Sequence, residues 1–267
     1  MSIVQNKDSQ FTRHPLNHEK LAMASFEMVD RFGHIYHRYL NDPNRLSTLI
    51  DRPLNGSITA IAEGDVCWYE DNRDILAVMF HPDKWNRIPP RKEMENMVRS
   101  GLVPELQTVL QKRYVKIPKV LELKTGTGSE RIALRYVLKL LNEYCAQNYW
   151  IDSFSPRLLS LVKDLSPETP TSLHTRLGTY GPCVIKTAFE IPPVSLKFLE
   201  TLDFVDAVTV TYKYSPARPL SNLGYHPDRV HRWVYQANKE LILGGIEEKT
   251  LAEKLQSGRS LAVYRKW

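Results

Sequence analysis

Two carboxylates stand close together in the segment AEGDV, where Glu63 and Asp65 interrupt a mostly apolar run. Side chains two residues apart on a β-strand share a face, so these two acids point the same way while Ala62 and Gly64 point the other way. Crowded like charges raise the pKa of one carboxyl group, whereas a divalent cation lets both stay ionised. The pair therefore predicts a cation site.

A third carboxylate follows in VLELK, where Glu122 and Lys124 share one strand face and the leucines turn toward the helices. If this strand lies parallel to the one before it, its acid can join the first two. Three oxygen ligands on rigid strands, completed by water and substrate, suit Mg²⁺ or Ca²⁺ better than zinc. We therefore predict that Glu63, Asp65 and Glu122 bind one divalent cation, Mg²⁺ or Ca²⁺.

Two histidines end apolar runs: His37 in YHRYL and His81 in MFHPD. Imidazole titrates near pH ~6.5, so one ring can take a proton from an attacking hydroxyl while the other gives a proton to the leaving oxygen. A cation between them would neutralise a phosphate oxygen, and Arg38 and Lys124 would hold the remaining phosphate charge. This pattern indicates in-line displacement at a phosphodiester.

Each motif also has a structural explanation. An isolated acid-x-acid pair is usually a solvated strand face, and a lone histidine at a strand end is as often structural or exposed. The order of the motifs along the chain favours a site over coincidence. His174, His226 and His231 have no partner pattern and are interpreted as structural or exposed, and KTGTGSE lacks the lysine and hydroxyl of a phosphate-binding P-loop.

The elements that position these residues alternate between short apolar runs and amphipathic segments, which is typical of parallel βα units. We predict a (β/α)₈ TIM barrel without a large inserted subdomain, with an open doubly wound sheet as the alternative. The acids would then lie at the carboxyl ends of the strands, where barrel enzymes build their sites. The predicted strands are GHIYHRYL, SITAIAEGDV, DILAVMFHP, PKVLELKTG, NYWIDSFS, PTSLHT, DAVTVTYKY, RVHRWVY and RSLAVYRKW.

Helix signals complete the outline. TGSERIALRYVLKLLNEY opens with Thr127 and Glu130 in capping-box spacing, and SPRLLSLVKDL opens with Ser155 as cap and Pro156 in the first turn. LNHEKLAMASFEMVDRFG predicts an extra N-terminal helix that covers the barrel floor or the gap after the last strand. Residues 1–33 are thus an N-terminal extension and helix, and residues 34–267 a single barrel domain.

The composition limits the classes of molecule that the protein is expected to bind. The chain has 267 residues, of which 42% are hydrophobic and 25% charged, so a large core is expected. The net charge of +6 is scattered, which favours an anionic small molecule over nucleic acid. No apolar run approaches a membrane span and no secretory signal is present, so we expect a cytoplasmic protein. Its three cysteines are expected to be reduced, buried thiols.

Over residues 34–267 these motifs resemble the glycerophosphodiester phosphodiesterase family. YHRYL is similar to its His-Arg-Gly opening, IAEGDV to its Glu-x-Asp strand, AVMFHPDKWNR to its second histidine segment and VLELK to its Glu-x-Lys strand. NYWIDSFSPRLLSLVKDL resembles its strand with a Ser-Phe-x-Pro-like turn, and VHRWVYQANKE its tryptophan-bearing seventh strand. The superfamily also contains spider-venom phospholipase D and the agrocinopine synthases.

The resemblance implies a TIM barrel with His37 and His81 as acid-base pair, and with Trp233 as a wall of the substrate pocket. It assigns metal ligation to Glu63, Asp65 and Glu122, and substrate binding to Arg38 and Lys124. Two positions depart from the family. Tyr39 stands where the opening motif has glycine, and Arg45 stands where the family often has an acid.

The sequence therefore predicts a metal-dependent phosphodiesterase for a glycerol-, sugar- or lysophospholipid-linked phosphodiester. Attack by a second alcohol instead of water would make the same site a synthase or transferase. The departures at Tyr39 and Arg45 leave open a degenerate barrel that binds phosphodiesters without turnover. A basic nucleic-acid-binding protein is a further alternative, although no recognised module supports it.

Overall fold

The computed structural model describes residues 33–50, 59–72, 74–83, 85–111, 117–145, 149–177, 196–212, 227–246 and 260–265. The predicted N-terminal helix, with His226 and Cys183, lies outside these described residues. None of the helices in the described part is both long enough and apolar enough to cross a membrane.

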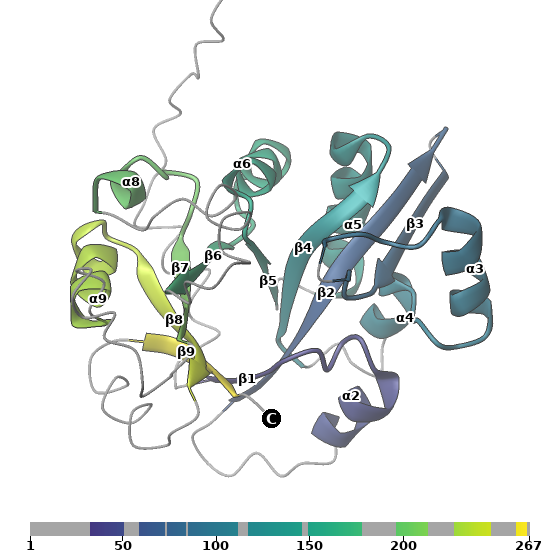
Figure 1. The fold of residues 1–267 in the computed structure, drawn as a ribbon, viewed down its shortest axis with the longest axis horizontal. Helices are drawn as coiled ribbons and strands as arrows, with labels where there is room; N and C mark the ends of the chain where they lie inside the picture. Colours follow the sequence, from purple (N-terminus) through teal and green to yellow (C-terminus); the bar gives the residue numbers. More distant parts are fainter. Residues whose placement is uncertain are drawn as a thin grey trace, which may run out of the picture.

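The described strands form a nine-stranded sheet whose parallel strands close into a ring. Neighbours around the ring pair in parallel, and β1 pairs with both β2 and β9, which closes the barrel (Figure 1). The predicted (β/α)₈ barrel is confirmed. The ring strands are β1 (Gly33–Tyr36), β2 (Thr59–Asp71), β4 (Lys119–Thr127), β5 (Tyr149–Ser153), β6 (Thr171–Leu177), β7 (Ala207–Tyr212), β8 (Glu240–Ile246) and β9 (Ser260–Arg265).

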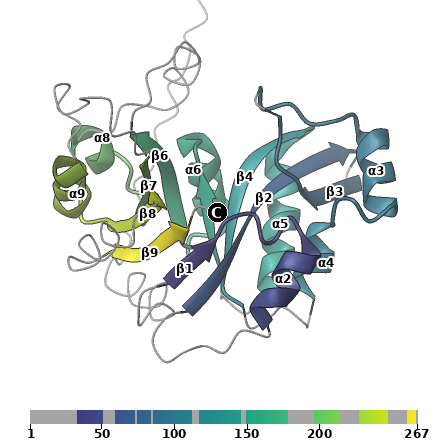
Figure 2. The same ribbon diagram turned by 60° about the horizontal axis from the view of Figure 1, so that its bottom comes forward.

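Helices lie on the outer side of this ring, as Figure 2 shows for α5, α6, α8 and α9. Ser155 caps α6 by accepting a hydrogen bond from the N–H of Leu158, as the sequence predicts. At α5 the predicted capping box is wrong, because the helix begins at Glu130 and Glu70 of β2 accepts the N–H of Ser129. The described helices are α2 (Pro43–Ile50), α3 (Arg91–Arg99), α4 (Leu106–Leu110), α5 (Glu130–Tyr144), α6 (Pro156–Leu165), α8 (Leu196–Glu200) and α9 (Pro227–Gln236).

Strand alternation divides the core into an inner and an outer part. Outward-facing residues such as Ala62, Leu121 and Leu123 pack under the helices, as predicted. Inward-facing side chains of several strands form a separate apolar cluster that fills the barrel below its carboxyl end. This cluster is the floor of the barrel, and it consists of Ile35, Ile61, Val120, Ala207 and Ile242, with Trp150 packed against it.

One predicted strand lies outside the ring, another predicted strand is a helix, and one strand of the ring was missed. The run DILAVMFHP forms β3 (Asp74–Met79), which pairs antiparallel with β2 and lies outside the ring. The run RVHRWVY is part of helix α9. The spacing of its apolar and polar residues fits an amphipathic helix as well as a strand. The ring position belongs instead to β8, in ELILGGI. The β2–β3 hairpin with α3 is a small extension of the barrel, buried around Cys67, Tyr69, Val78, Met94 and Val103.

Candidate active site

A row of carboxylates lies directly above the barrel floor. Asp65 of β2 is in register with Glu122 of β4, which is in register with Asp152 of β5. All three point into the barrel with Glu63, and none is more than 2% exposed. Since neighbouring strands are about 4.8 Å apart, three acids stand side by side in a nearly dry environment. Burying so many like charges is costly unless positive charge compensates them.

The predicted ligand set converges. Glu63, Asp65 and Glu122 each offer one oxygen, and these oxygens lie within 4.8 Å of one another. Oε1 of Glu63 is buried and has no hydrogen-bond partner among the described residues. An orphaned carboxylate oxygen aimed into a group of acids fits a hard cation, because Mg²⁺ and Ca²⁺ take oxygen ligands. The donor set therefore fits the predicted metal.

Lys124 supplies positive charge to this group. Its ammonium Nζ lies 3.0 Å from Oδ1 of Asp65 and forms an ion pair with Oε1 of Glu122. Burial lowers the pKa of Lys124, but the two carboxylates outweigh burial and raise the pKa overall. Burial raises the pKa of Glu122 to about 7, opposed by Lys124. Lys124 thus stays charged and holds two of the three proposed ligands.

His37 lies at the carboxyl end of β1, beside the acids. Its Nδ1 is 2.8 Å from Oε2 of Glu63, and the same oxygen accepts the backbone N–H of Arg38 at 2.6 Å. Burial lowers the pKa of His37, but the hydrogen bond and charge of Glu63 outweigh it, so the pKa is raised. Glu63 therefore fixes the orientation of the imidazole, while the ring keeps 42% of its surface exposed.

The sequence did not predict the role of Asn41, which locks the loop after β1 onto β2. Its amide Nδ2 donates to Oδ2 of Asp65 at 3.2 Å, and its Oδ1 accepts the N–H of Asp65 at 3.0 Å. The loop approaches so closely because Gly64 has no side chain. A Cβ atom there would lie 2.5 Å from Cβ of Leu40 and 2.6 Å from Oδ1 of Asn41.

The two departures from the family pattern have local explanations. Arg38 has φ of +59°, so the left-handed residue beside His37 is the arginine, whereas Tyr39 is buried and packs on Tyr36 with ring centroids 5.1 Å apart. The tyrosine thus fills core space without needing the backbone freedom of glycine. Arg45 lies on α2, where its Nε is 3.4 Å from Oδ2 of Asp42.

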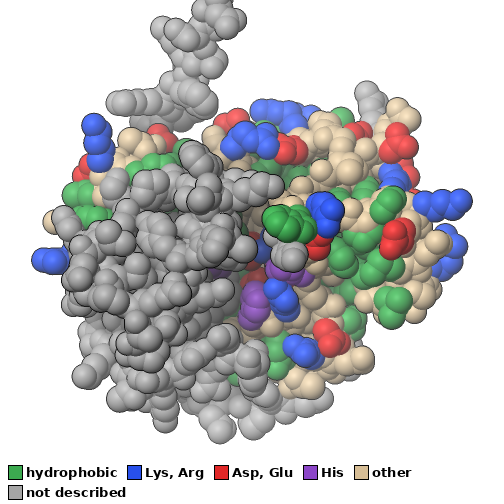
Figure 3. Space-filling view, viewed as in Figure 1, with side chains coloured by type: hydrophobic (Ala, Val, Ile, Leu, Met, Phe, Trp, Pro, Cys, Tyr) green, Lys and Arg blue, Asp and Glu red, His purple; other side chains and the backbone are tan. Residues whose placement is uncertain are grey.

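His81 follows the hairpin strand β3 and is exposed. Partial burial of its ring lowers its pKa; Asp65 opposes this effect, and Arg38 adds to it. The charges of Asp65 and Arg38 influence the pKa of both His37 and His81, and a shared site for the two imidazoles stays a prediction. Figure 3 shows histidine, acidic and basic side chains together near the centre of one face.

Arg38 and Trp233, which were also predicted to contact substrate, lie in different parts of the structure. Arg38 lies at the site, with Nε 3.7 Å from Oδ2 of Asp65. Trp233 is half-buried on helix α9 and not on a strand, and its assignment as a wall of the substrate pocket stays a prediction. His231 lies on the same helix.

His174 is a residue that sequence reasoning dismissed. Its Nδ1 lies 2.8 Å from Oδ2 of Asp152 on the neighbouring strand, and its ring stacks on Phe154 with centroids 4.2 Å apart. The missed signal was strand alternation: Asp152 in YWIDS and His174 in TSLHT both fall on the inward face.

Comparisons with known proteins identify the fold. No protein-family model matches the chain, and no curated protein sequence matches it either. Solved structures do. A phosphodiesterase from Oleispira antarctica, in complex with the product sn-glycerol-3-phosphate, is 18% identical with a TM-score of 0.58, over 87% of this chain and 92% of that one.

Two further structures agree. A glycerophosphodiester phosphodiesterase from Parabacteroides distasonis is 16% identical with a TM-score of 0.56, over 88% of this chain and 93% of that one. One from Agrobacterium tumefaciens is 13% identical with a TM-score of 0.55, over 87% and 95%. At these identities the likeness shows the fold, and the chain has the barrel fold of these phosphodiesterases over nearly the full length of both partners.

Proposed function

We propose that this protein is a metal-dependent phosphodiesterase of the glycerophosphodiester phosphodiesterase type. The observation that carries the proposal is the convergence of Glu63, Asp65 and Glu122 beside an imidazole that Glu63 holds. The shared fold supports it independently. The product bound to the Oleispira antarctica enzyme supports a small glycerol-linked phosphodiester as substrate, with sugar- and lysolipid-linked diesters as chemical neighbours.

Glu63, Asp65 and Glu122 would hold one divalent cation, Mg²⁺ or Ca²⁺. When bound, that cation supplies positive charge that polarises the phosphoryl group. The buried acids favour cation binding, because added positive charge relieves their mutual repulsion.

The two imidazoles would move the protons. Glu63 holds Nδ1 of His37, and Nδ1 of His81 lies 2.6 Å from the carbonyl oxygen of Pro82. Each ring is thereby oriented through Nδ1, and its Nε2 would exchange a proton with substrate. One Nε2 takes the proton of the attacking hydroxyl, and the other returns a proton to the leaving oxygen.

Positive side chains would position the phosphate. The guanidinium of Arg38 is half-exposed beside Asp65, where it can take a phosphate oxygen with two N–H groups. Lys124 keeps its charge between Asp65 and Glu122 at the edge of the same site. Both contacts favour an anionic substrate and stabilise the additional charge that develops on phosphorus oxygens during displacement.

The test is a phosphorus NMR panel of glycerophosphodiesters, sugar phosphodiesters and lysophospholipids, each with Mg²⁺, Ca²⁺ or EDTA. We expect at least one diester to be cleaved with a divalent cation and none with EDTA. Glu63→Gln should abolish cleavage, while Asp164→Asn, at an exposed acid on α6, should retain it. Metal binding without cleavage of any diester would overturn the proposal and favour a non-catalytic binding barrel. A mixed diester formed with an added alcohol would instead identify a transferase.

A further inference from the structure

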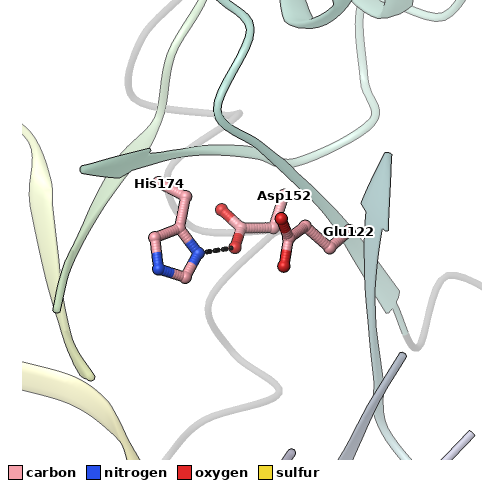
Figure 4. Close-up of side chains that lie close together, drawn as sticks. All are labelled: Glu122, Asp152 and His174. Carbon is pink, nitrogen blue, oxygen red and sulfur yellow. Dashed lines mark hydrogen bonds and ion pairs between the residues drawn. The ribbon is translucent and has the colours of Figure 1, made fainter. Parts of the chain in front are cut away.

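A second group of possible metal ligands adjoins the first on the far side of Glu122. Glu122, Asp152 and His174 each offer one ligand atom, and these atoms lie within 4.8 Å of one another. Figure 4 shows the three side chains turned toward one another from neighbouring strands. All three residues are buried, with His174 the most exposed at 9%. Two carboxylates and an imidazole are a suitable donor set for divalent transition metals such as Mn²⁺.

The two groups share Glu122 and no other residue. Glu63 and Asp65 belong to β2, while Asp152 and His174 belong to β5 and β6, and β4 lies between them. One ion with bonds of ~2.0–2.6 Å joins ligand atoms that are at most about 5 Å apart. Because β2 and β5 are two strand spacings apart, about 10 Å, a single ion fits either group better than both.

The second group is held in place by further contacts. Oδ1 of Asp152 accepts hydrogen bonds from Oγ of Ser172 at 2.7 Å and Oγ1 of Thr209 at 3.4 Å. The ring of His174 stacks on Phe154 at an interplanar angle of 26°. Outer partners of this kind fix the orientation of metal ligands. Nδ1 of His174 is hydrogen-bonded to Oδ2 of Asp152 at 2.8 Å, which fixes the orientation of the imidazole.

The lysine and arginine side chains that pair with these carboxylates lie on the side of the first group. Four buried carboxylates lie along the row, and Lys124 is the buried cation of the described residues that pairs with them. Its ion pairs go to Asp65 and Glu122, so it stands on the side of the first group. The half-exposed guanidinium of Arg38, with Nε 3.7 Å from Oδ2 of Asp65, lies on the same side. None of these ion pairs of Lys124 and Arg38 reaches Asp152 of the second group.

We infer that Glu122, Asp152 and His174 hold a second divalent cation beside the first, with the Glu122 carboxylate shared between the two ions. The inference rests on the proposed function only for the existence of the first ion. Two cations bridged in this way are typically ~3.5–4 Å apart and clamp two oxygens of a phosphodiester at once. The substrate class would then be a diester whose phosphate spans both ions, and Asp152 and His174 would be ligands.

The experiment measures metal stoichiometry with Mn²⁺, which replaces Mg²⁺ in oxygen-rich sites and is visible by EPR. The full chain is stripped with EDTA, dialysed against Mn²⁺ and analysed by equilibrium dialysis and EPR. We expect two Mn²⁺ per chain and the broad multiline spectrum of a coupled pair. His174→Ala and Asp152→Asn should each bind one Mn²⁺ with an uncoupled six-line spectrum, as should Glu63→Gln. Asp164→Asn is the matched control and should bind two.

A wild-type chain that binds one Mn²⁺ would overturn the inference, whatever the variants do. A coupled pair of Mn²⁺ ions that persists in both His174→Ala and Asp152→Asn would also overturn it. Neither residue would then be a metal ligand, and the two would only form a hydrogen bond with each other. The diester panel run on the same samples separates this result from the proposed function. If the wild-type protein cleaves a diester but binds one Mn²⁺, the inference of a second ion is wrong and the proposed function stands. If it binds two Mn²⁺ but cleaves no diester, the proposed function is wrong and the second metal site stands.

Discussion

Nδ1 of His37 lies 2.8 Å from Oε2 of Glu63, so one acid both faces the proposed cation and holds the proposed catalytic imidazole. Removing the imidazole should therefore stop proton transfer without disturbing the barrel, since His37 is partly exposed at the end of β1. We expect His37→Ala, and likewise His81→Ala, to reduce turnover by about 10²–10⁴-fold, the usual range for a general acid or base. Diester cleavage by phosphorus NMR is the measurement, and unchanged circular dichroism is the control. A fully active variant would exclude that histidine from the reaction.

Lys124 predicts a stability effect that depends on metal. In the metal-free protein its ammonium compensates Asp65 and Glu122, which are buried. Lys124→Met leaves these carboxylates without that partner, so unfolding free energy in EDTA should fall by about 3–5 kcal/mol. Added Mg²⁺ or Ca²⁺ should restore part of the loss. Lys139→Met, at an exposed site on α5, is the control for urea unfolding with and without metal. An equal loss in both conditions would contradict a cation site at these acids.

Gly64 predicts a steric effect on the same site. The added methyl of Gly64→Ala would meet Leu40 at 2.5 Å and Asn41 at 2.6 Å, so the loop that holds Asp65 must shift. We expect a loss of about 1–3 kcal/mol, as for overpacking in a core, together with weaker metal binding. Gly101→Asn is the matched control, because Gly101 has φ of +76°, which asparagine tolerates, and open space around it. Wild-type metal affinity in Gly64→Ala would show that the loop does not position Asp65.

Strand alternation explains what the sequence could reveal of this site. The inward faces of β2 and β4 follow directly from Glu63, Asp65 and Glu122, because residues two apart share a face whatever the surrounding fold. The same rule, applied to YWIDS and TSLHT, reaches Asp152 and His174. Their convergence with Glu122, however, depends on the register between β4, β5 and β6, which a single sequence does not display.

The errors have equally local causes. DILAVMFHP has the composition of a barrel strand, but the short turn after Asp71 returns it antiparallel along β2. RVHRWVY alternates between polar and apolar residues like a short strand, but its apolar spacing also fits an amphipathic helix. In the structure it is helical. The cap of α5 comes from Glu70, some sixty residues earlier in the chain, so no local pattern could have predicted it.

The cysteines allow a simple check of the hairpin extension and of α5. Cys67 and Cys145 are free and buried, as predicted for reduced thiols, and burial raises the pKa of Cys67 to about 12. Burial also raises the pKa of Cys145. In a Cys183→Ser background we expect almost no reaction with a disulfide reagent at pH 8 in the native state, and two reactive thiols in guanidinium chloride. Rapid native reaction of one thiol would show that its surroundings open readily.

Lys239 predicts how stability changes in alkaline solution. Lys239 directly precedes β8, and its buried ammonium donates to the carbonyls of Leu202 at 2.5 Å and Val205 at 2.7 Å, which lie between α8 and β7. Burial lowers its pKa to about 8; Asp206 and Asp203 oppose the shift, and Lys163 adds to it. The unfolded chain, with an ordinary lysine pKa near 10.4, therefore binds more protons than the folded chain between these two values.

Unfolding free energy should consequently rise as pH increases from about 8 to about 10.4, by on the order of 3 kcal/mol from this group. The sign follows because deprotonation removes a charge that the folded state buries and the unfolded state hydrates. Lys239→Met should remove this rise in urea unfolding measured across the window, even if loss of two hydrogen bonds lowers stability at every pH. Lys139→Met should keep the wild-type slope. If Lys239→Met also keeps the wild-type slope, deprotonation of Lys239 does not cause the rise in unfolding free energy with pH.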